Sequence, residues 1–491
     1  MSRNIKKMGQ VYTPHAIVCD ILDTVGYNGV EILDKHIMEN SCGPGAFLIE
    51  IVERYIKTSF DEKRESELIK ANLETFIHAI DIDHENVCNA KKSLTELAER
   101  YGIENVAWDV KCADSLTVND YDDKMDYVVG NPPYIRVHNL ENSYNSVKKY
   151  KFAQDGMTDI YIVFFEIGLK MLRDGGKLSY ITPSSYYNSK AGTALRRYIQ
   201  STQSVYRIMD LGHYNPFEET TYTTITAFCK GIESESVQYY AYDLESGRPT
   251  FIDSIPYVEL FVNGDLFLME NSEKRKQFAR IYNIDRKNNT QIQVKNGFAT
   301  LADSVFIGDN FEGFDNTIDV IKGSTGSWKK CIYPYDENGV LLPFEKLSPE
   351  VRDYLMANRE KLDKRDADKN QWYAFGRTQA LKDVSKYKVA VNTLFKDLNS
   401  LKINELPPGK GVYSGLYILS DFSLEDIKSV LSTQDFIDYI KAIKKYKSGG
   451  YYTFSTEDLN KYLLYKLCNI RNNNTQLTLF TDIGSSAQLS Q

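Results

Sequence analysis

The stretch Asp126-Tyr127-Val128-Val129-Gly130-Asn131-Pro132-Pro133-Tyr134 carries the first evidence for both the fold and the chemistry of this chain. Its apolar, β-branched run 127–129 predicts a short buried strand that ends at Gly130. The two prolines have fixed φ angles and no N–H, so they form a stiff turn whose carbonyls can point outward. The side-chain carbonyl of Asn131 adds one more acceptor. The turn suits a planar group that donates two hydrogens, such as an exocyclic amine, although a plain Pro-Pro turn explains it equally well.

Composition indicates a protein of several domains that works in a reducing compartment. A chain of 491 residues is long enough for about two to four domains that each bury a core. The seven cysteines include no C-x-x-C pair and no zinc-site spacing, so we expect neither a disulfide framework nor a metal. No apolar run approaches the ~20 residues of a membrane span, and acidic residues interrupt the apolar stretch near the N-terminus.

Charge is unevenly distributed along the chain. The net charge of −8 argues mildly against a nucleic-acid partner. Residues 322–402, however, contain 16 lysines and arginines against 11 acidic residues. Basic and aromatic residues alternate in this region, as DNA-contacting surfaces require, and the candidates for DNA contact are Arg377, Lys386 and Lys388. Ordinary solvated surface charge explains many such clusters.

Two segments that precede the Pro-Pro turn have the pattern of a nucleotide-binding sheet. Thr13 is a reasonable N-cap for an amphipathic helix expected over 14–25, with Pro14 at its first position. The segment 37–48 predicts a strand, then a tight glycine turn, and then the start of a helix over 46–57. Such a turn lets a ligand approach the backbone at a helix N-terminus, although G-x-G alone is a weak signal.

Acidic residues follow the next two predicted strands. The strand 75–82 ends in Asp81-Ile82-Asp83, and the strand 106–112 leads to Asp114. In a parallel sheet ligands lie outside the carboxyl ends of the strands, where an acid after the second strand can bind ribose hydroxyls. We therefore expect one edge of the sheet to carry Glu39, Asp81, Asp114 and Asn131. Capping of the next helix by Asp83 and a turn role for Asp114 are the structural alternatives.

The ordered series of motifs resembles the adenine-specific DNA N6-methyltransferases of the TaqI-like and Eco57I-like type, which belong to restriction-modification systems. The order of the pieces is specific, whereas each piece alone is not. In chain order the pieces are Gln10–Pro14, Glu39–Phe47, Asp81–Asp83, Ala113-Asp114, Asn131–Tyr134, Thr158–Tyr161, Gly176–Pro183, Ile208–Leu211, Phe217 and Tyr222–Thr226. The sequence departs from the family at Asn40-Ser41, where a proline and a small residue are commoner.

The resemblance implies a Rossmann-like α/β domain that binds S-adenosylmethionine and methylates N6 of an adenine flipped out of double-stranded DNA. Thr13 and Glu39 would hold the methionine end of the cofactor, and Asp81 its ribose. The full set of implied cofactor-binding residues is Thr13, Glu39, Ser41, Cys42, Gly43, Gly45, Asp81, Ile82, Asp114 and Asn131. The implied catalytic residues are Asn131, Pro132, Pro133 and Tyr134. The flipped base would stack between Tyr134 and Phe217, which we expect in an exposed loop, with Tyr222 as the alternative to Phe217.

The character of the sequence changes at about Gln238, where loops rich in Asn, Gly and Asp become frequent. We expect a catalytic methyltransferase domain over 1–240, an α+β DNA target-recognition domain over 241–480 and a flexible tail over 481–491. We also expect a monomer in the cytoplasm of a prokaryote, away from membranes. The sequence leaves open a separate cognate restriction endonuclease as a second partner besides DNA.

Two other classes of function remain open at this point. Similar Asn-Pro-Pro-Tyr turns serve methyltransferases that act on other planar amines, in RNA bases or in protein glutamine. A large C-terminal domain with basic and aromatic loops favours DNA over these substrates. A non-enzymatic DNA-specificity protein is the second alternative, but it would not need the cofactor loop and the acidic residues after the strands.

Overall fold

The structure divides the chain into two compact units, Met1–Lys276 and Gln277–Gln491. It is a computed structural model that describes residues 13–136, 144–156, 158–217, 222–266, 271–284, 291–311, 313–365 and 371–467. The predicted boundary lay at 240, but the sheet of the first unit continues to Pro256. The tail expected over 481–491 lies outside the described residues. Within the described ranges no helix has both the length and the apolar character needed to cross a membrane.

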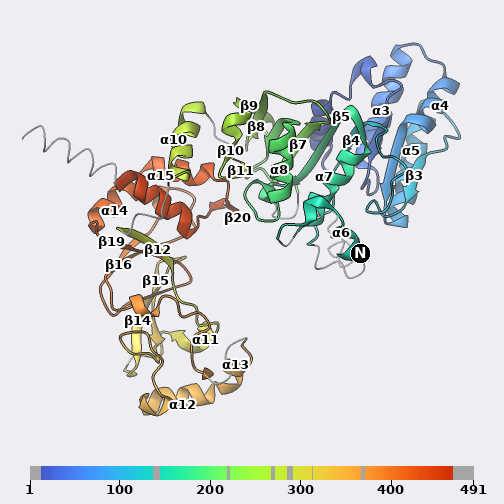
Figure 1. The fold of residues 1–491 in the computed structure, drawn as a ribbon. Helices are drawn as coiled ribbons and strands as arrows, with labels where there is room; N and C mark the ends of the chain where they lie inside the picture. Colours follow the sequence, from blue (N-terminus) through green and yellow to red (C-terminus); the bar gives the residue numbers. More distant parts are fainter. Residues whose placement is uncertain are drawn as a thin grey trace, which may run out of the picture. The chain divides into compact units, whose positions relative to one another are not determined.

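One nine-stranded sheet forms the centre of the first unit (Figure 1). Its strands are β1 (Ile37–Glu39), β2 (Ile77–Asp81), β3 (Asp109–Cys112), β4 (Met125–Gly130), β5 (Leu172–Pro183), β6 (Val205–Asp210), β7 (Thr223–Cys229), β8 (Ser236–Tyr242) and β9 (Pro249–Pro256). Their spatial order is β3-β2-β1-β4-β5-β7-β6-β8-β9. The strands from β3 to β5 pair in parallel, and β7 lies antiparallel between β5 and β6. The strand order reverses between β1 and β4, and ligands bind at such switch points in open α/β sheets.

Helices cover both faces of this sheet. One face carries α2 (His15–Val25), α3 (Ala46–Asp61), α4 (Ser66–Phe76) and α5 (His84–Arg100), and the other carries α7 (Ile160–Met171) and α8 (Thr193–Thr202). Successive strand residues feed the two cores alternately, as a β-strand requires. Ile37 and Val129 belong to the first core, whereas Met38 and Val128 belong to the second. This arrangement confirms the predicted Rossmann-like α/β domain, although β2 begins at Ile77 because α4 continues to Phe76.

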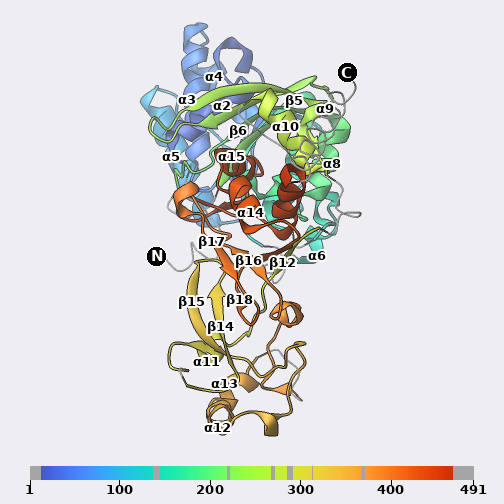
Figure 2. The same ribbon diagram turned by 90° about the vertical axis from the view of Figure 1, so that its left-hand side faces the viewer.

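The second unit contains two four-stranded sheets, parts of which are seen in Figure 2. The first has the order β12 (Ile292–Asn296), β19 (Leu416–Ser420), β16 (Lys388–Val391) and β17 (Ile403–Leu406). The second has the order β13 (Ile307–Gly308), β15 (Ser327–Ile332), β14 (Thr317–Lys322) and β18 (Gly411–Tyr413). Helices add α12 (Pro349–Ala357), α13 (Arg359–Asp363), α14 (Leu424–Leu431), α15 (Gln434–Ala442) and a helix over 456–467. The unit is therefore α+β, as predicted.

Two short helices of this unit follow one another closely. α14 ends at Leu431 and α15 begins at Gln434. The break occurs because the Thr433 side chain accepts a hydrogen bond from the Phe436 N–H at 3.2 Å and so caps a new helix.

A fully buried carboxylate, that of Asp383, holds the first of the small sheets together. Its Oδ2 accepts from Lys295 Nζ on β12 and from the Tyr417 hydroxyl on β19, both at 2.8 Å. Its Oδ1 accepts from Lys386 Nζ at 2.8 Å. Burial by itself raises the pKa of Asp383, but these hydrogen bonds outweigh that effect and hold the pKa at about 2. A buried charge needs such partners, so the network links two neighbouring strands to the segment before β16.

Replacing Asp383 with Asn should loosen this sheet, because the Lys295 ammonium group would lose its buried partner. We expect protection of β12, β16 and β19 against hydrogen exchange to fall by about 3 kcal/mol near neutral pH. The folded pKa of Asp383 lies below the unfolded value of about 4. Its contribution is therefore present above about pH 4 and is lost as the pH falls towards about 2. Hydrogen–deuterium exchange mass spectrometry of the full-length chain at several pH values measures both effects.

Asp319 offers a matched control for this substitution. It forms a partly exposed pair with Lys330 at 2.8 Å in the same unit, and Asp319→Asn should change protection by less than about 0.5 kcal/mol. Unchanged protection in Asp383→Asn, or an equal deficit at about pH 2 and at neutral pH, would contradict the stabilising role of the buried network.

Candidate active site

The loops that leave β1, β2 and β4 are fastened to one another at the switch point of the sheet. The Ser41 hydroxyl donates to the main-chain carbonyl of Asn131 at 3.3 Å, which joins the loop after β1 to the Pro-Pro turn after β4. The Gly43 N–H donates to Asp81 Oδ2 at 2.7 Å, which joins the same loop to the end of β2. The predicted cofactor loop and the predicted catalytic turn therefore lie side by side.

Asp81 is buried at the end of β2 and shapes the turns around it. Besides the Gly43 N–H, it accepts at Oδ1 from the Asp83 N–H at 2.8 Å and from Asn86 Nδ2 at 3.1 Å. A carboxylate offers about four acceptor positions, so these three bonds leave capacity for a ribose hydroxyl. Asp83 itself caps α5 by accepting from the Glu85 N–H at 2.8 Å, which is the structural role that we expected for it.

Glu39 is the buried acid at the end of β1. It is 2% exposed, and its Oε2 has no hydrogen-bond partner within the described parts of the chain. Burial raises the pKa of Glu39 well above its usual value, and the negative charge of Asp81 adds to the rise. A ligand that brings a positive charge or an N–H donor would satisfy this oxygen and favour the charged carboxylate. The amino group of the methionine end of S-adenosylmethionine has both properties, so Glu39 fits that group.

The two glycines of the turn have different surroundings. Gly43 and Gly45 have φ angles of +51° and +98°, a backbone region that residues other than glycine rarely adopt. A Cβ atom on Gly43 would meet no heavy atom within 4 Å, whereas a Cβ on Gly45 would come within 3.2 Å of Ala90 on α5. Gly43 therefore borders space that a ligand can use, and Gly45 permits close packing of α3 against α5.

Cys42 lies between these glycines and the end of β1. It is 3% exposed, and burial raises the pKa of its thiol far above the ordinary value, with the charges of Glu39 and Asp81 adding to the effect. The thiol is therefore protonated at neutral pH and is not a nucleophile. This agrees with the space-filling role that the sequence suggested.

Ile82 and Asp114, two of the implied cofactor-binding residues, directly follow β2 and closely follow β3, respectively. Ile82 is 63% exposed, although it directly follows a buried strand. Asp114 follows β3, and its Oδ1 accepts from the Leu116 N–H at 3.0 Å. Asp114 thus has the turn role that the sequence offered as an alternative, and this role is compatible with accepting from an amine through its other oxygen.

Thr13 is not the helix cap that the sequence indicated. α2 begins at His15 with Pro14 as its N-cap and no side-chain cap. Pro14 has extended φ and ψ angles of −61° and 145°, so the helix starts one residue later than expected. Thr13 is 4% exposed, and its Oγ1 accepts a hydrogen bond from Asn131 Nδ2 at 3.0 Å. A residue at the start of the first helix therefore contacts the predicted catalytic amide directly.

Tyr134 is held at both ends of its side chain. Its hydroxyl donates to the main-chain carbonyl of Ile181 on β5 at 3.2 Å, and its ring meets the Tyr161 ring edge-on at 6.4 Å between centroids. Burial raises the pKa of Tyr134 well above its usual value, so it stays a neutral phenol. The aromatic group after the prolines is thus fixed in position rather than free to rotate.

Asn40 is a part of the site that the sequence reasoning missed. Its Oδ1 accepts from the Tyr180 hydroxyl at 2.8 Å, and its main-chain carbonyl accepts from the Ser115 hydroxyl at 2.6 Å. It therefore ties the end of β1 to β5 and to the turn after β3. The available signal was an uncharged polar residue directly after a buried strand, at the first of the two positions where the motif departs from the commoner family pattern.

Phe217 corrects another expectation. The sequence placed it in an exposed loop as a stacking partner, but it is 7% exposed and packs in the same core as α2 and α3. Apolar burial explains this position, since a phenyl ring loses favourable transfer energy when it is left in water. Tyr222, the alternative stacking residue, is only partly buried, and its ring lies 5.3 Å from that of His213.

The three candidates for DNA contact in the second unit have different environments. Arg377 is exposed, and its backbone pairs with Ala299. Lys386 forms an ion pair with Asp383. Lys388 is 2% exposed and donates to the carbonyls of Asp383, Val384 and Lys386, while burial lowers its pKa to about 8. The expectation that Lys388 contacts DNA is therefore wrong, because its ammonium group is needed to satisfy buried carbonyls.

Among the described residues, His15, Cys19 and Glu50 form the one group that could hold a metal ion. His15 Nε2 lies 3.0 Å from Glu50 Oε2, but Arg54 Nε donates to the other oxygen of Glu50 at 2.8 Å. His15 also opens α2, so the positive end of the helix dipole and the guanidinium group both disfavour a cation there. The group is better described as a surface ion-pair cluster.

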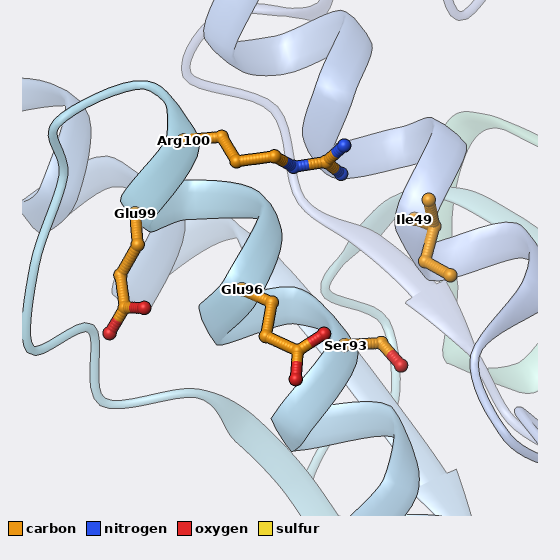
Figure 3. Close-up of a pocket in the computed structure, with 5 residues that line it drawn as sticks. All are labelled: Ile49, Ser93, Glu96, Glu99 and Arg100. Atoms are coloured by element: carbon orange, nitrogen blue, oxygen red, sulfur yellow. The ribbon is translucent and has the colours of Figure 1, made fainter.

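A surface pocket is lined by residues of α3 and α5 (Figure 3). It is lined by Ile49 on α3 and by Ser93, Glu96, Glu99 and Arg100 on α5. None of these is a predicted site residue, and the acidic side chains around it give no reason to place the cofactor there.

Comparison with known proteins shows similarity to restriction-modification methyltransferases. Residues 36–217 match the family described as Eco57I restriction-modification methylase. The type II methyltransferase M.BstVI of Geobacillus stearothermophilus is 25% identical over 416 residues, which cover 74% of this chain and 73% of the relative. M.PaeR7I of Pseudomonas aeruginosa is 26% identical over 413 residues, which cover 75% and 70%. The combined restriction enzyme and methyltransferase RM.Eco57I of Escherichia coli is 23% identical, but the chain spans only 48% of its length.

The structural comparison extends over both units. The type IIL restriction-modification enzyme MmeI, solved in complex with DNA, aligns with 90% of this chain at a TM-score of 0.62 and 10% identity, and 65% of the MmeI chain is covered. At this identity the likeness shows the fold alone. The family match and the relatives confirm the resemblance that the motifs predicted: residues 36–217 of this chain are similar to the Eco57I restriction-modification methylases.

Proposed function

We propose that this chain transfers the methyl group of S-adenosylmethionine to N6 of an adenine flipped out of double-stranded DNA, as the modification enzyme of a type II restriction-modification system. The observation that carries the proposal is the Asn131–Tyr134 turn at the switch point, fastened to the cofactor loop through Ser41. The relatives named type II methyltransferases support DNA as the substrate. A monomer that works beside a separate restriction endonuclease belongs to the same proposal.

The turn suits an exocyclic amine for a chemical reason. The lone pair of adenine N6 is conjugated into the ring, so the amine is a poor nucleophile. Acceptance of its two hydrogens by Asn131 Oδ1 and by the Pro132 carbonyl would favour a pyramidal nitrogen and stabilise the charge that develops on it. S-adenosylmethionine supplies an electrophilic methyl group, so the residues of the chain need only hold the two reactants in line. No nucleophilic side chain is required, in agreement with the neutral thiol of Cys42.

An adenine inside a duplex cannot reach this turn, so the base must be extruded. The ring of Tyr134 is fixed by its hydroxyl bond to Ile181 and would stack on one face of the base. Since Phe217 is buried, Tyr222 is the better candidate for the second face. Recognition of the DNA sequence would fall to the second unit, where Arg377 is the exposed candidate.

The alternatives differ in what they would require of the chain. A methyltransferase for protein glutamine or an RNA base could use the same turn, but the similarity to type II methyltransferases over three quarters of the chain favours DNA. A non-enzymatic DNA-specificity protein would have no need for the buried acid Glu39 beside a glycine turn.

Sequencing of modified bases in DNA from cells that express the chain should reveal N6-methyladenine at one short motif. Unmodified adenine throughout would refute the proposal.

Asn131→Ala should lower the rate of methyl transfer far more than it lowers DNA affinity. Loss of one acceptor of the reacting amine should cost about 3 kcal/mol or more of transition-state stabilisation, by analogy with the loss of an oxyanion-hole donor. DNA affinity should change little, because phosphate contacts made elsewhere carry most of it. Single-turnover methyl transfer, measured alongside DNA affinity, separates the two. A near-normal rate of methyl transfer by this variant would show that Asn131 has no role in the reaction and that the motif is only a structural turn.

Asp81→Asn should weaken cofactor binding by about fivefold or more, because the NH₂ end of the amide would face the N–H of Gly43 or of Asp83, both of which donate to the carboxylate. Asp83→Asn is the matched control, since Asn caps a helix as well as Asp does and should leave the affinity unchanged. Isothermal titration calorimetry measures the affinity of both variants for S-adenosylmethionine. Equal affinities for the two variants would remove Asp81 from the cofactor site.

If the Arg377 side chain contacts a phosphate, Arg377→Ala should lower DNA affinity. It should also make the plot of the logarithm of the association constant against the logarithm of salt concentration less steep, by about 1. The control is Lys364→Ala, which removes an exposed cation of the same unit that is already paired with Glu360 at 2.8 Å. Binding isotherms at several salt concentrations measure both quantities. Identical behaviour of the two variants would exclude Arg377 from the DNA contact.

A further inference from the structure

We propose that Thr13 is a positioning residue that sets which end of the Asn131 side-chain amide faces the substrate. The inference rests on the proposed function and adds to it, because the family resemblance gave Thr13 only a contact with the cofactor. It concerns a hydrogen bond between residues 118 positions apart in the chain, from Asn131 Nδ2 to Thr13 Oγ1 at 3.0 Å.

The proposed chemistry depends on the orientation of this amide. An asparagine side chain ends in an oxygen and an NH₂ group of nearly the same shape, so packing alone does not distinguish the two orientations. With Oδ1 towards the reacting amine, the side chain accepts an N6 hydrogen. With Nδ2 there, two donors would meet and the interaction would be lost. A partner at the other end of the amide can select the orientation, and the Thr13 hydroxyl is such a partner.

Thr13 selects the orientation only if its hydroxyl acts as an acceptor. A threonine hydroxyl can donate one hydrogen and accept others. If its hydrogen faced Asn131, Oδ1 would turn towards Thr13 and away from the substrate. Once that hydrogen is donated to a different acceptor, Oγ1 can only accept, and Nδ2 must face it. This is the direction of the bond in the structure.

A carboxylate at the methionine end of the cofactor would be such an acceptor. The Thr13 hydroxyl would then donate to the cofactor and accept from Asn131 Nδ2. Bound cofactor would in this way fix the orientation of the Asn131 amide. The main chain of Asn131 is held separately by the Ser41 hydroxyl at 3.3 Å, so Thr13 acts on the side chain alone. The amide is thereby set to accept an amine when the methyl donor is in place.

Three variants of the full-length chain test the idea. Thr13→Val keeps the branched shape of the buried side chain and removes its hydroxyl, and Thr13→Ser restores the hydroxyl. Thr24→Val is the matched control: Thr24 lies at the other end of α2, is 5% exposed, and its hydroxyl donates to the Asp20 carbonyl at 2.7 Å, away from the turn. All three should leave DNA affinity unchanged.

The first measurement is single-turnover methyl transfer at saturating S-adenosylmethionine. We expect Thr13→Val to lower the rate constant roughly tenfold, as the loss of one hydrogen bond in the reacting geometry would. Thr13→Ser should recover most of the rate, and Thr24→Val should stay within about twofold. A Thr13→Val variant that needs more cofactor but reaches the normal rate would overturn the positioning role and leave Thr13 as a cofactor contact only.

The second measurement does not depend on activity. In protein labelled with ¹⁵N-asparagine, the side-chain NH₂ resonances of Asn131, assigned through Asn131→Asp, should shift in Thr13→Val but not in Thr24→Val or Thr13→Ser. Unchanged resonances in Thr13→Val would refute the hydrogen bond and the proposal with it. If the wild-type chain methylates no adenine, the proposed function fails and the positioning role fails with it, whereas the spectra still decide separately whether the bond exists.

Discussion

The parallel pairing of β1 with β4 is the constraint on which the site depends. Its register sets Glu39 opposite Val129, so the loop after β1 and the Pro-Pro turn after β4 leave the sheet next to each other. Both strands are buried on both faces, and a shift by one residue would move Ile37 and Met38 into the wrong cores. The register is therefore strongly determined by packing, and the position of the Asn131 turn follows from it.

Buried polar groups at this edge have two separate tasks. Asn40 and Asp81 are engaged by hydrogen bonds from within the chain, and they hold the loops in place. Glu39 is as deeply buried, but one of its oxygens meets no donor among the described residues. Because an unsatisfied buried carboxylate is costly, Glu39 marks the point where a cationic or donor group of a ligand is expected. The division is not complete, since the Nδ2 atom of Asn40 also has no hydrogen-bond partner among the described residues.

The second unit uses some of its positive charge for its own stability. Lys295 and Lys386 neutralise the buried carboxylate of Asp383, and Lys388 satisfies main-chain carbonyls. These cations are consequently poor candidates for phosphate contacts, even though they lie in the basic part of the sequence. A count of charges along a chain does not separate cations that face solvent from cations that neutralise the interior.

The sequence alone predicted the class of the first unit, its first four strands and its resemblance to the Eco57I restriction-modification methylases. It could do so because strands buried on both faces and glycine turns leave local patterns, and because the Asn131-Pro132-Pro133-Tyr134 turn is rigid by its own covalent structure. The positions of Glu39 and Asp81 at strand ends followed from the same local patterns. The end of the first unit was not found from the sequence, since β9 continues its sheet to Pro256, beyond the predicted boundary at 240.

Only the tertiary structure decided how side chains far apart in the sequence are used. Thr13 looked like a helix cap and instead accepts from Asn131, and Phe217 looked exposed and is buried. Lys388 looked available to DNA and is enclosed. In each case the local sequence allowed two roles of similar energy, and the choice between them came from a partner brought near by the fold. Hydrogen bonding and burial depend on those neighbours, which no local pattern in the sequence can supply.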